Sequence, residues 1–320
     1  MRNGSLIDII PAMIGRLSNG VNDLNDSAHK SSKPNESKQW IPYLLASPIF
    51  LWLTIFFLVP IFFLIVMSFR GYSPTKGITD QFTTTHYVKF LTDSFYLGIL
   101  YRSIKLSVLV TLISLILGYP EAYYLTIIKG KKKALFLALI LSPLFVSAVI
   151  RTFGWMIILA PHGLINSGLD LLGLIREPVK FMYSEKGIVI GLVHVLMPYM
   201  VLSVYSSLIN RNMDLEKAAQ SLGAHPLKTF FKITLPLSLP GILSGTLIVL
   251  TLSVSAFITP AMLGGTRVRV VPFVTYEQFM VLLNWPFGSV AALVLLAITV
   301  GIVMFYHRAL ERGRWAEVFR

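Results

Sequence analysis

The sequence has no cysteine and few charged residues. Asp, Glu, Lys and Arg together make up only 13% of its 320 residues. Without cysteine the chain cannot form disulfides, thiolate nucleophiles, iron–sulfur clusters or zinc sites with cysteine ligands. A soluble globular protein carries about 25% charged residues, so this chain has too few charges to cover a surface that faces water. Soluble and disordered classes are therefore excluded.

Apolar residues take the place of the missing charges. Hydrophobic residues make up 55% of the chain, and the mean hydropathy is +0.71. A helix needs roughly 20 apolar residues to cross a bilayer. The segments of this length are 41–69, 104–128, 134–160, 187–209, 240–263 and 287–306. Because the bilayer core holds no water, each segment must satisfy its own backbone hydrogen bonds, as a helix does. The sequence predicts an all-α integral membrane protein with six transmembrane helices.

The basic residues are unevenly divided between the two sets of connections. Most of the 28 lysines and arginines fall in the N-terminal tail, the loops 129–133 and 210–240, and the C-terminus. Cytoplasmic loops are enriched in Lys and Arg, so both termini and these loops are predicted to be cytoplasmic. The net charge of +13 is then a topology signal, and we expect no nucleic-acid partner.

This topology divides the chain into four parts. A polar cytoplasmic tail covers residues 1–40, and a first transmembrane helix with an outer loop covers 41–99. A core transmembrane domain follows at 100–308, and a cytoplasmic C-terminus at 309–320. Within the tail, residues 6–17 are either an amphipathic helix on the membrane surface or part of a disordered segment.

The loop 210–240 is long for a connection between membrane helices and has a regular plan. Asp214 can cap a helix, and Glu216 lies in its first turn. One apolar stripe is formed by Leu215, Ala218, Ala219 and Leu222. Gly223 is expected to end this helix and Pro226 to begin a second one. The pattern predicts a helix–turn–helix whose stripe either packs on its own bundle or docks a cytoplasmic partner.

The second predicted helix carries both apolar and basic residues. Its apolar face is expected to hold Leu227, Phe230 and Phe231. Lys228 and Lys232 stand four residues apart, where like charges mildly destabilise an isolated helix. The lysine pair therefore favours contact with lipid headgroups or with an acidic partner. Pro236 and Pro240 are expected to end the unit.

The spacing within this loop is distinctive. Ala218-Ala219 is followed after three residues by Gly223 and, nine residues later, by Ile233-x-Leu235-Pro236. This pattern resembles the EAA loop of binding-protein-dependent ABC transporter permeases, whose consensus is Glu-Ala-Ala, three residues, Gly, nine residues and Ile-x-Leu-Pro. One position departs from the consensus, because its Glu falls on Lys217 and the nearest acid is Glu216.

The likeness extends over roughly residues 45–308. Segments such as Met197-Pro198-Tyr199-Met200, Gly264-Gly265 and Trp285-Pro286-Phe287-Gly288 resemble the spermidine/putrescine permease subgroup. The solute implied is therefore a polyamine or a similar molecule. An opine, an amino acid, a phosphonate and ferric iron stay open as alternatives. An ion-coupled secondary transporter is a further alternative, but only Arg151 and Glu121 could supply charges within the spans.

The resemblance implies the ABC type-1 permease fold and a role in ATP-driven import across a bacterial inner membrane. It implies a second permease subunit, two cytoplasmic ATP-binding subunits and a periplasmic substrate-binding protein as partners. The chain has no G-x-x-x-x-G-K-[ST] phosphate loop, so ATP and Mg²⁺ are expected on the partner, with no cofactor or enzyme activity in this chain. The residues implied to couple to the ATPase are Leu215, Glu216, Lys217, Ala218, Ala219, Leu222, Gly223, Ile233, Leu235 and Pro236.

The candidates for a substrate pathway are Arg151, Tyr199, Glu277 and Trp285. A charge that faces lipid is costly, so Arg151 should face the bundle interior or a water-filled path. Glu277 lies in an outer loop and could meet a cationic ligand. Each candidate has a structural alternative, because charges can snorkel or pair for folding and aromatic residues anchor at membrane interfaces. The six histidines lack the spacing of a metal site, and no metal is expected.

Overall fold

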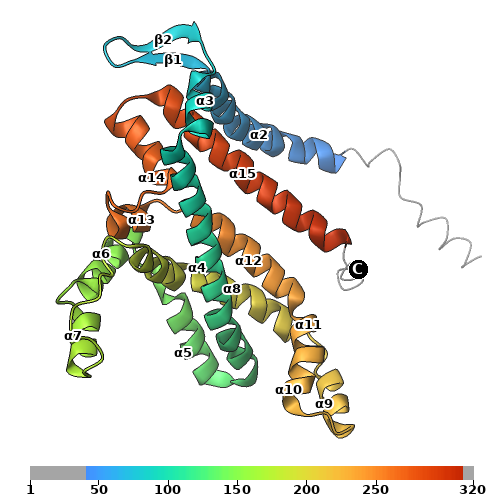
Figure 1. Ribbon diagram of the computed structural model, residues 1–320. Helices are drawn as coiled ribbons and strands as arrows, with labels where there is room; N and C mark the ends of the chain where they lie inside the picture. The colour runs from blue at the N-terminus through green and yellow to red at the C-terminus, as the bar shows by residue number, and fades with distance from the viewer. Residues whose placement is uncertain (1–40, 313–320) are drawn as a thin grey trace, which may run out of the picture. The chain divides into compact units, whose positions relative to one another are not determined.

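The computed structural model describes residues 41–312, so the predictions for the tail 1–40 and for 313–320 lie outside the described residues. Helices dominate this part of the chain (Figure 1). The helical segments long and apolar enough to cross a membrane are Ser47–Ser68, Ser94–Ile127, Ala148–Leu171, Glu185–Ile209 and Trp285–Tyr306. A bent pair, Pro226–Leu237 with Leu239–Val254, makes a sixth if it is one span. The predicted all-α membrane fold is confirmed.

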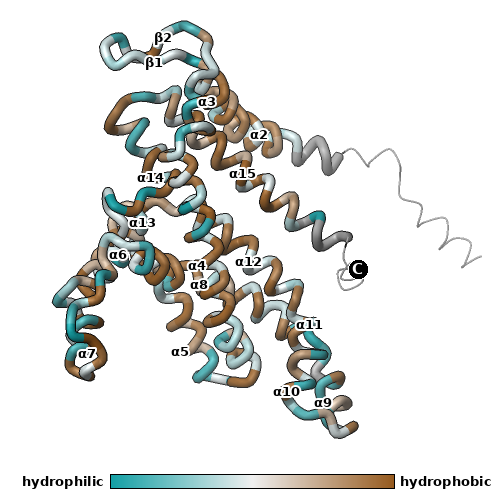
Figure 2. The backbone as a smooth tube through the Cα atoms, in the orientation of Figure 1, coloured by the Kyte–Doolittle hydropathy of each residue, from teal (hydrophilic) through white to brown (hydrophobic). Residues whose placement is uncertain are grey.

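The first of these segments, Ser47–Ser68, belongs to α2 (Ile41–Ser68) and is mostly hydrophobic (Figure 2). Residues from Phe62 onward form one compact unit, and α2 up to Ile61 belongs to a separate one. An unbroken apolar helix without charges is suited to lipid contact on all sides. Two prolines, Pro48 and Pro60, lie within it, which membrane helices tolerate.

The core of the larger unit is a bundle of α4 (Ser94–Ile127), α8 (Glu185–Ile209) and α12 (Leu239–Val254) (Figure 1). Glycines let these helices approach closely, as is common between membrane helices. A Cβ atom on Gly118 of α4 would lie 3.2 Å from the Cγ2 atom of Val201 in α8. On α12, a Cβ on Gly245 would lie 2.8 Å from Sδ of Met200. The packing surface is therefore set by small residues on α4 and α12 against larger ones on α8.

Three hydroxyl groups in the first half of α4 are hydrogen-bonded within the bundle. Ser103, Ser107 and Thr111 each donate to the backbone carbonyl four residues earlier, at 2.9, 2.8 and 2.7 Å. Ser103 Oγ also accepts from the backbone N–H of Val271 at 2.9 Å. An unpaired polar group in an apolar interior is costly, so these bonds let α4 carry polar residues while it stays buried.

Two of the six predicted helices are broken, and this part of the prediction is wrong. The segment 134–160 forms α5 (Gly130–Leu141), a 3₁₀ turn η2 (Ser142–Phe145) and α6 (Ala148–Leu159). Pro143 lies in that turn, where its lack of an N–H cannot sustain an α-helix. The segment 240–263 forms α12 and, after a turn at 255–257, α13 (Ile258–Gly264). Hydrophobic length alone does not reveal such breaks.

At the end opposite the 210–240 loop, the chain forms a two-stranded antiparallel sheet of β1 (Arg70–Ser73) and β2 (Gly77–Phe82), followed by α3 (Thr85–Thr92) (Figure 1). The short helix α14 (Val271–Tyr276) and the π-helical turn η4 (Glu277–Val281) precede α15 (Trp285–Arg312), which contains the last candidate span. Helix α7 (Leu164–Leu171) follows α6 and belongs to the candidate span Ala148–Leu171. Tyr72 of β1 donates from its hydroxyl to the carbonyl of Leu282 at 2.7 Å, which fixes the hairpin to the start of α15.

Candidate coupling site

Residues 210–240 lie at one end of the bundle and form a helix–turn–helix, as predicted (Figure 1). The elements are α9 (Met213–Ser221), α10 (Pro226–Thr229), the π-helical turn η3 (Phe230–Thr234) and α11 (Leu235–Leu237). Hydrophilic residues gather at this end, whereas the bundle above it is hydrophobic (Figure 2). The loop is therefore a polar extension of a membrane-embedded bundle.

The cap of α9 differs from the prediction. Asn212, not Asp214, is the N-cap residue, and its Oδ1 accepts from the backbone N–H of Asp214 at 2.9 Å. Asp214 and Glu216 both fall in the first turn, where their charge complements the helix dipole. Asn and Asp cap helices about equally well, so the sequence alone does not separate the two positions.

Gly223 ends α9 as predicted. Its φ is +81°, a left-handed conformation that glycine adopts without steric penalty. The N–H of Gly223 donates to Gln220 O at 2.9 Å, and the N–H of Ala224 donates to Ala219 O at 3.0 Å. This is the hydrogen-bond pattern of a Schellman motif. A Cβ atom at this glycine would meet nothing within 4 Å, so the constraint on Gly223 is the backbone conformation alone.

The apolar stripe of α9 is largely uncovered. Leu215 is 48% exposed and Leu222 is 89% exposed. Ala218 between them is exposed too, and Ala219 is half-buried. Exposed apolar patches mark interaction surfaces. The alternative in which the stripe packs on its own bundle is therefore disfavoured.

The second helix does not present the single apolar face that was predicted. Phe230 turns inward, and its ring centroid lies 5.7 Å from that of Tyr119 and 6.2 Å from that of Tyr123, both on α4. Phe231 is 61% exposed and Leu227 is 63% exposed. Adjacent residues on a helix point about 100° apart, so neighbouring phenylalanines cannot both face α4.

An ion pair missed by the sequence analysis lies inside the loop. Glu216 Oε1 is 2.8 Å from Nε of Arg211, and it accepts a hydrogen bond from Thr234 Oγ1 at 2.7 Å. The side chains of Arg211 and Glu216 are only 2% and 12% exposed. Lys217, at the consensus Glu position, is 72% exposed and pairs with Asp214 at 3.1 Å. Glu216 therefore faces inward and Lys217 faces outward.

The helix continues past the predicted end at Pro236 and then bends. Pro236 lies in the first turn of α11, where a missing N–H costs little. The pair α10–α11 and α12 meet at 61°. At this bend the hydroxyl of Ser207 on α8 donates to Leu237 O at 3.3 Å. Ile233, Leu235 and Pro236 are half-buried along this stretch.

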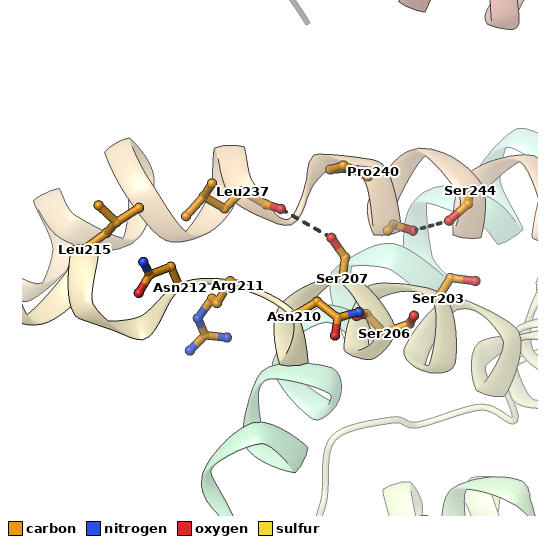
Figure 3. Close-up of a pocket in the computed structure, with 11 residues that line it drawn as sticks. Ser203, Ser206, Ser207, Asn210, Arg211, Asn212, Leu215, Leu237, Pro240 and Ser244 are labelled. Atoms are coloured by element: carbon orange, nitrogen blue, oxygen red, sulfur yellow. Dashed lines mark hydrogen bonds between the residues drawn. The ribbon is translucent and has the colours of Figure 1, made fainter. Parts of the chain in front are cut away.

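A cavity of about 470 Å³ borders the bend (Figure 3). Its polar lining from α8 comprises Ser203, Ser206, Ser207 and Asn210, and α12 contributes Ser244. Leu215 of α9 and Leu237 of α11 lie at the other side of the same space (Figure 3). The 61° bend therefore borders open space.

The four candidate pathway residues do not form one polar cluster among the described residues. Arg151 on α6 donates from Nη1 to the carbonyls of Pro143 and Val146, the latter at 3.1 Å, and so folds back on the turn before its own helix. Glu277 pairs with Arg269 at 3.2 Å. Trp285 packs edge-on against Phe279, and Tyr199 on α8 is 36% exposed. Their role in a substrate pathway stays a prediction.

Curated relatives of known identity cover most of the chain. It is 33% identical over 258 residues to the spermidine/putrescine transport system permease protein PotB of Escherichia coli K12, a match that spans 81% of this chain and 94% of PotB. The PotB of Haemophilus influenzae is 32% identical, over 82% of this chain and 91% of its own length.

Solved structures share the fold at lower identity. A bacterial alginate ABC transporter, in complex with an alginate pentasaccharide-bound periplasmic protein, has a chain that matches with a TM-score of 0.72 at 20% identity, covering 86% of this chain and 95% of that one. An inward-facing MetNI methionine ABC transporter matches with a TM-score of 0.53 at 16% identity, covering 69% and 98%. The chain thus has the ABC type-1 permease fold.

The remaining comparison concerns the family as a whole. Residues 35–315 match the model of the binding-protein-dependent transport system inner membrane component. The match includes the apolar helices and the whole loop that contains α9–α11. The chain therefore belongs to the family of binding-protein-dependent transport system inner membrane components, and it is a multi-pass permease subunit rather than an enzyme.

Proposed function

We propose that this permease subunit imports a polyamine and that α9 docks a separate ATP-hydrolysing subunit. The observation that carries the docking is the uncovered stripe of Leu215, Ala218 and Leu222, held at the end of the bundle by the capped helix α9. Two leucines flank a small residue, so a partner surface can bury the leucines and still approach the α9 backbone closely.

The proposal includes the orientation of the chain in the membrane and its partner subunits. Loop 210–240, loop 129–133 and both termini lie in the cytoplasm, where the excess of Lys and Arg favours them. Two ATP-binding subunits hold ATP and Mg²⁺, and a second permease subunit completes the membrane part. A periplasmic binding protein delivers the solute at the opposite end, which carries the β1–β2 hairpin.

The choice of a polyamine is supported by relatives that carry spermidine/putrescine in their names and match over four fifths of this chain. The test is uptake of radiolabelled spermidine by the whole complex in proteoliposomes, driven either by ATP or by an ion gradient. We expect uptake that needs ATP and survives ionophores. Uptake that follows the ion gradient would identify a secondary transporter instead. Competition by amino acids, opines, phosphonates or ferric iron would identify a different solute.

Replacing Leu222 by Asp should weaken the attachment of the ATPase. Leu222 is 89% exposed, so the change should leave the fold of the permease intact. Burying a leucine side chain contributes about 1.5–3 kcal/mol, so its loss should weaken ATPase binding roughly 10–150-fold. The measurement is the amount of ATPase that copurifies with the permease over a range of protein concentrations.

The matched control is Leu174→Asp, because Leu174 is also largely exposed, at 67%, but lies outside the loop and outside the segments able to cross a membrane. This variant should retain the ATPase at the wild-type level. Equal retention by Leu222→Asp and Leu174→Asp would show that α9 is not the docking surface.

A further inference from the structure

Arg211 occupies an unusual place for a charged residue. It lies between the end of α8 and the start of α9. Among the charged residues whose side chains the structure describes, it is the one that is buried. Burial of an unpaired charge is unfavourable, and a residue at a polar loop has easy access to water. The structure must therefore supply Arg211 with compensating contacts.

Three contacts supply that compensation. The Nη1 atom donates to the carbonyl of Leu208 at 3.2 Å, and the guanidinium lies 5.4 Å from the centre of the Tyr123 ring on α4. Its Nε lies 2.8 Å from Oε1 of Glu216 on α9, an ion pair in which the N–H is not aligned for a hydrogen bond. Arginine suits such a site because its planar group both stacks on rings and binds carboxylates. Arg211 thus connects α4, α8 and α9.

Glu216 extends this connection to the second helix of the loop. The same Oε1 atom accepts from Thr234 Oγ1 at 2.7 Å, and Thr234 is itself buried at the end of η3. One carboxylate oxygen therefore joins the end of α8, the first turn of α9 and the end of η3. This polar link adds to the packing of α9 against α10 and η3.

We propose that Arg211, Glu216 and Thr234 form an internal latch that makes α9 and α10–α11 move as one rigid body. The inference rests on the proposed docking of an ATPase at α9. A displacement of α9 reaches η3 through the latch, then passes along α11 to the bend at Ser238 and so to α12. Arg211 and Glu216 are positioning residues for coupling, because they lie behind the apolar stripe rather than on it.

The latch also gives a physical account of the departure from the Glu-Ala-Ala pattern. Glu216 precedes the consensus position by one residue, which turns its side chain by about 100° around the helix axis. The acid therefore points into the loop, and Lys217 takes the outward position. The inward acid contacts the rest of the loop, while the outward lysine pairs with Asp214 at the surface.

The exposed pair Asp214–Lys217 offers a matched comparison within the same helix. Its side chains are 81% and 72% exposed, and such surface pairs contribute little. In a buried pair, removal of one partner leaves the other charge uncompensated, whereas replacement of both by apolar residues is often tolerated. The latch therefore predicts that replacing Glu216 alone greatly loosens the loop, whereas Asp214→Asn has little effect on it. Replacing both Arg211 and Glu216 by apolar residues should restore the rigidity.

The experiment measures the rigidity of the loop directly. Because the natural chain has no cysteine, the exposed residues Gln220 on α9 and Lys232 on η3 can be replaced by Cys and spin-labelled without further changes. The distance distribution between the labels is measured on the full chain in nanodiscs. We expect a narrow distribution in the labelled parent and in D214N, at least a twofold broader one in E216Q, and a narrow one again in the double variant R211M/E216L.

A second measurement, on the assembled complex, tests whether a rigid loop is needed to couple ATP hydrolysis to import. With spermidine as the probe, E216Q should copurify with the ATPase like the wild type but hydrolyse at least tenfold more ATP for each molecule imported. R211M/E216L should recover coupling. The latch proposal is wrong if E216Q leaves the distribution of label distances unchanged. It is also wrong if E216Q broadens that distribution without changing the amount of ATP hydrolysed per molecule imported. If the wild-type chain retains no ATPase or imports no spermidine, the proposed function fails, and the label distances still decide whether the latch exists.

Discussion

Replacing Gly241 by Ala should lower the melting temperature of the permease and abolish most of its transport. Gly241 is in the first turns of α12, where this helix crosses α8. An added Cβ would lie 2.5 Å from the backbone oxygen of Ser203, 2.6 Å from Cβ of Ser207 and 3.0 Å from Cα of Val204. Two of these atoms belong to the α8 backbone and cannot rotate away, so α12 must move outward.

The expected size follows from the cost of overpacking. Adding a methyl group to a filled contact costs about 1–3 kcal/mol. The same substitution normally favours a helix by up to about 1 kcal/mol. The clash should therefore turn an expected stabilisation into a net loss that thermal unfolding in detergent can detect. Transport should fall further than stability, because the displaced segment is the one through which α11 connects to α12.

Gly301→Ala on α15 is the matched control. It is also a glycine within an apolar helix, but a Cβ there would meet nothing within 4 Å. It should keep the wild-type melting temperature or raise it slightly, with normal uptake. If Gly241→Ala has the same melting temperature as Gly301→Ala, α8 and α12 can move apart at no cost in stability. The close crossing of these two helices would then not be needed to transmit movement from α11 to α12.

The sequence predicts those features of the site that depend on residue spacing along one helix. Gly223 is placed correctly at the end of α9 because a left-handed residue after an apolar stripe is a local signal. The stripe of Leu215 and Leu222 follows equally from helical periodicity. Whether that stripe is covered is a property of the folded chain, and only the structure shows that it is open.

The latch could not be predicted because it joins residues that are distant in sequence. Thr234 follows Glu216 by 18 residues, and their contact depends on the turn at Gly223 and on the π-helical turn η3. In the sequence, Arg211 is only one more basic residue of a predicted cytoplasmic loop. The sequence does contain a local signal, because Glu216 stands one residue before the consensus acid. That position alone does not identify the residues that Glu216 contacts.

The same distinction explains the errors in the transmembrane helices. Apolar composition identifies the segment 134–160 as long enough to span a bilayer, but the break at η2 depends on Pro143 and on the path of the neighbouring helices. The second predicted helix, expected from residue 104, begins at Ser94 because Asp93 caps it, with Oδ1 accepting from the N–H of Phe95 at 2.9 Å. Helix α4 therefore extends beyond its apolar core by residues that hydropathy assigns to a loop.

Replacing Gly223 by Val should uncouple ATP hydrolysis from uptake while the permease still inserts and folds. A left-handed conformation costs an ordinary residue about 1–2 kcal/mol, and a β-branched side chain is especially unfavourable there. This shifts the balance between the native turn and a rearranged one by roughly 5–30-fold. The space around the glycine is open, so no packing is lost, and the melting temperature should change little. The measurement is ATP hydrolysed per molecule of spermidine imported, together with the yield of assembled complex.

Two controls separate this turn from glycine loss in general. Gly223→Asn should behave almost like the wild type, because Asn tolerates the left-handed region. Gly130→Val introduces the same kind of strain at φ +62° in another connection, again with open space around the glycine, and should leave coupling intact. The turn fixes the angle between α9 and α10, and the latch fixes the distance from α9 to η3, so either change alone should loosen the loop. Normal coupling in Gly223→Val would show that the backbone conformation of this turn is not needed to transmit the movement of α9.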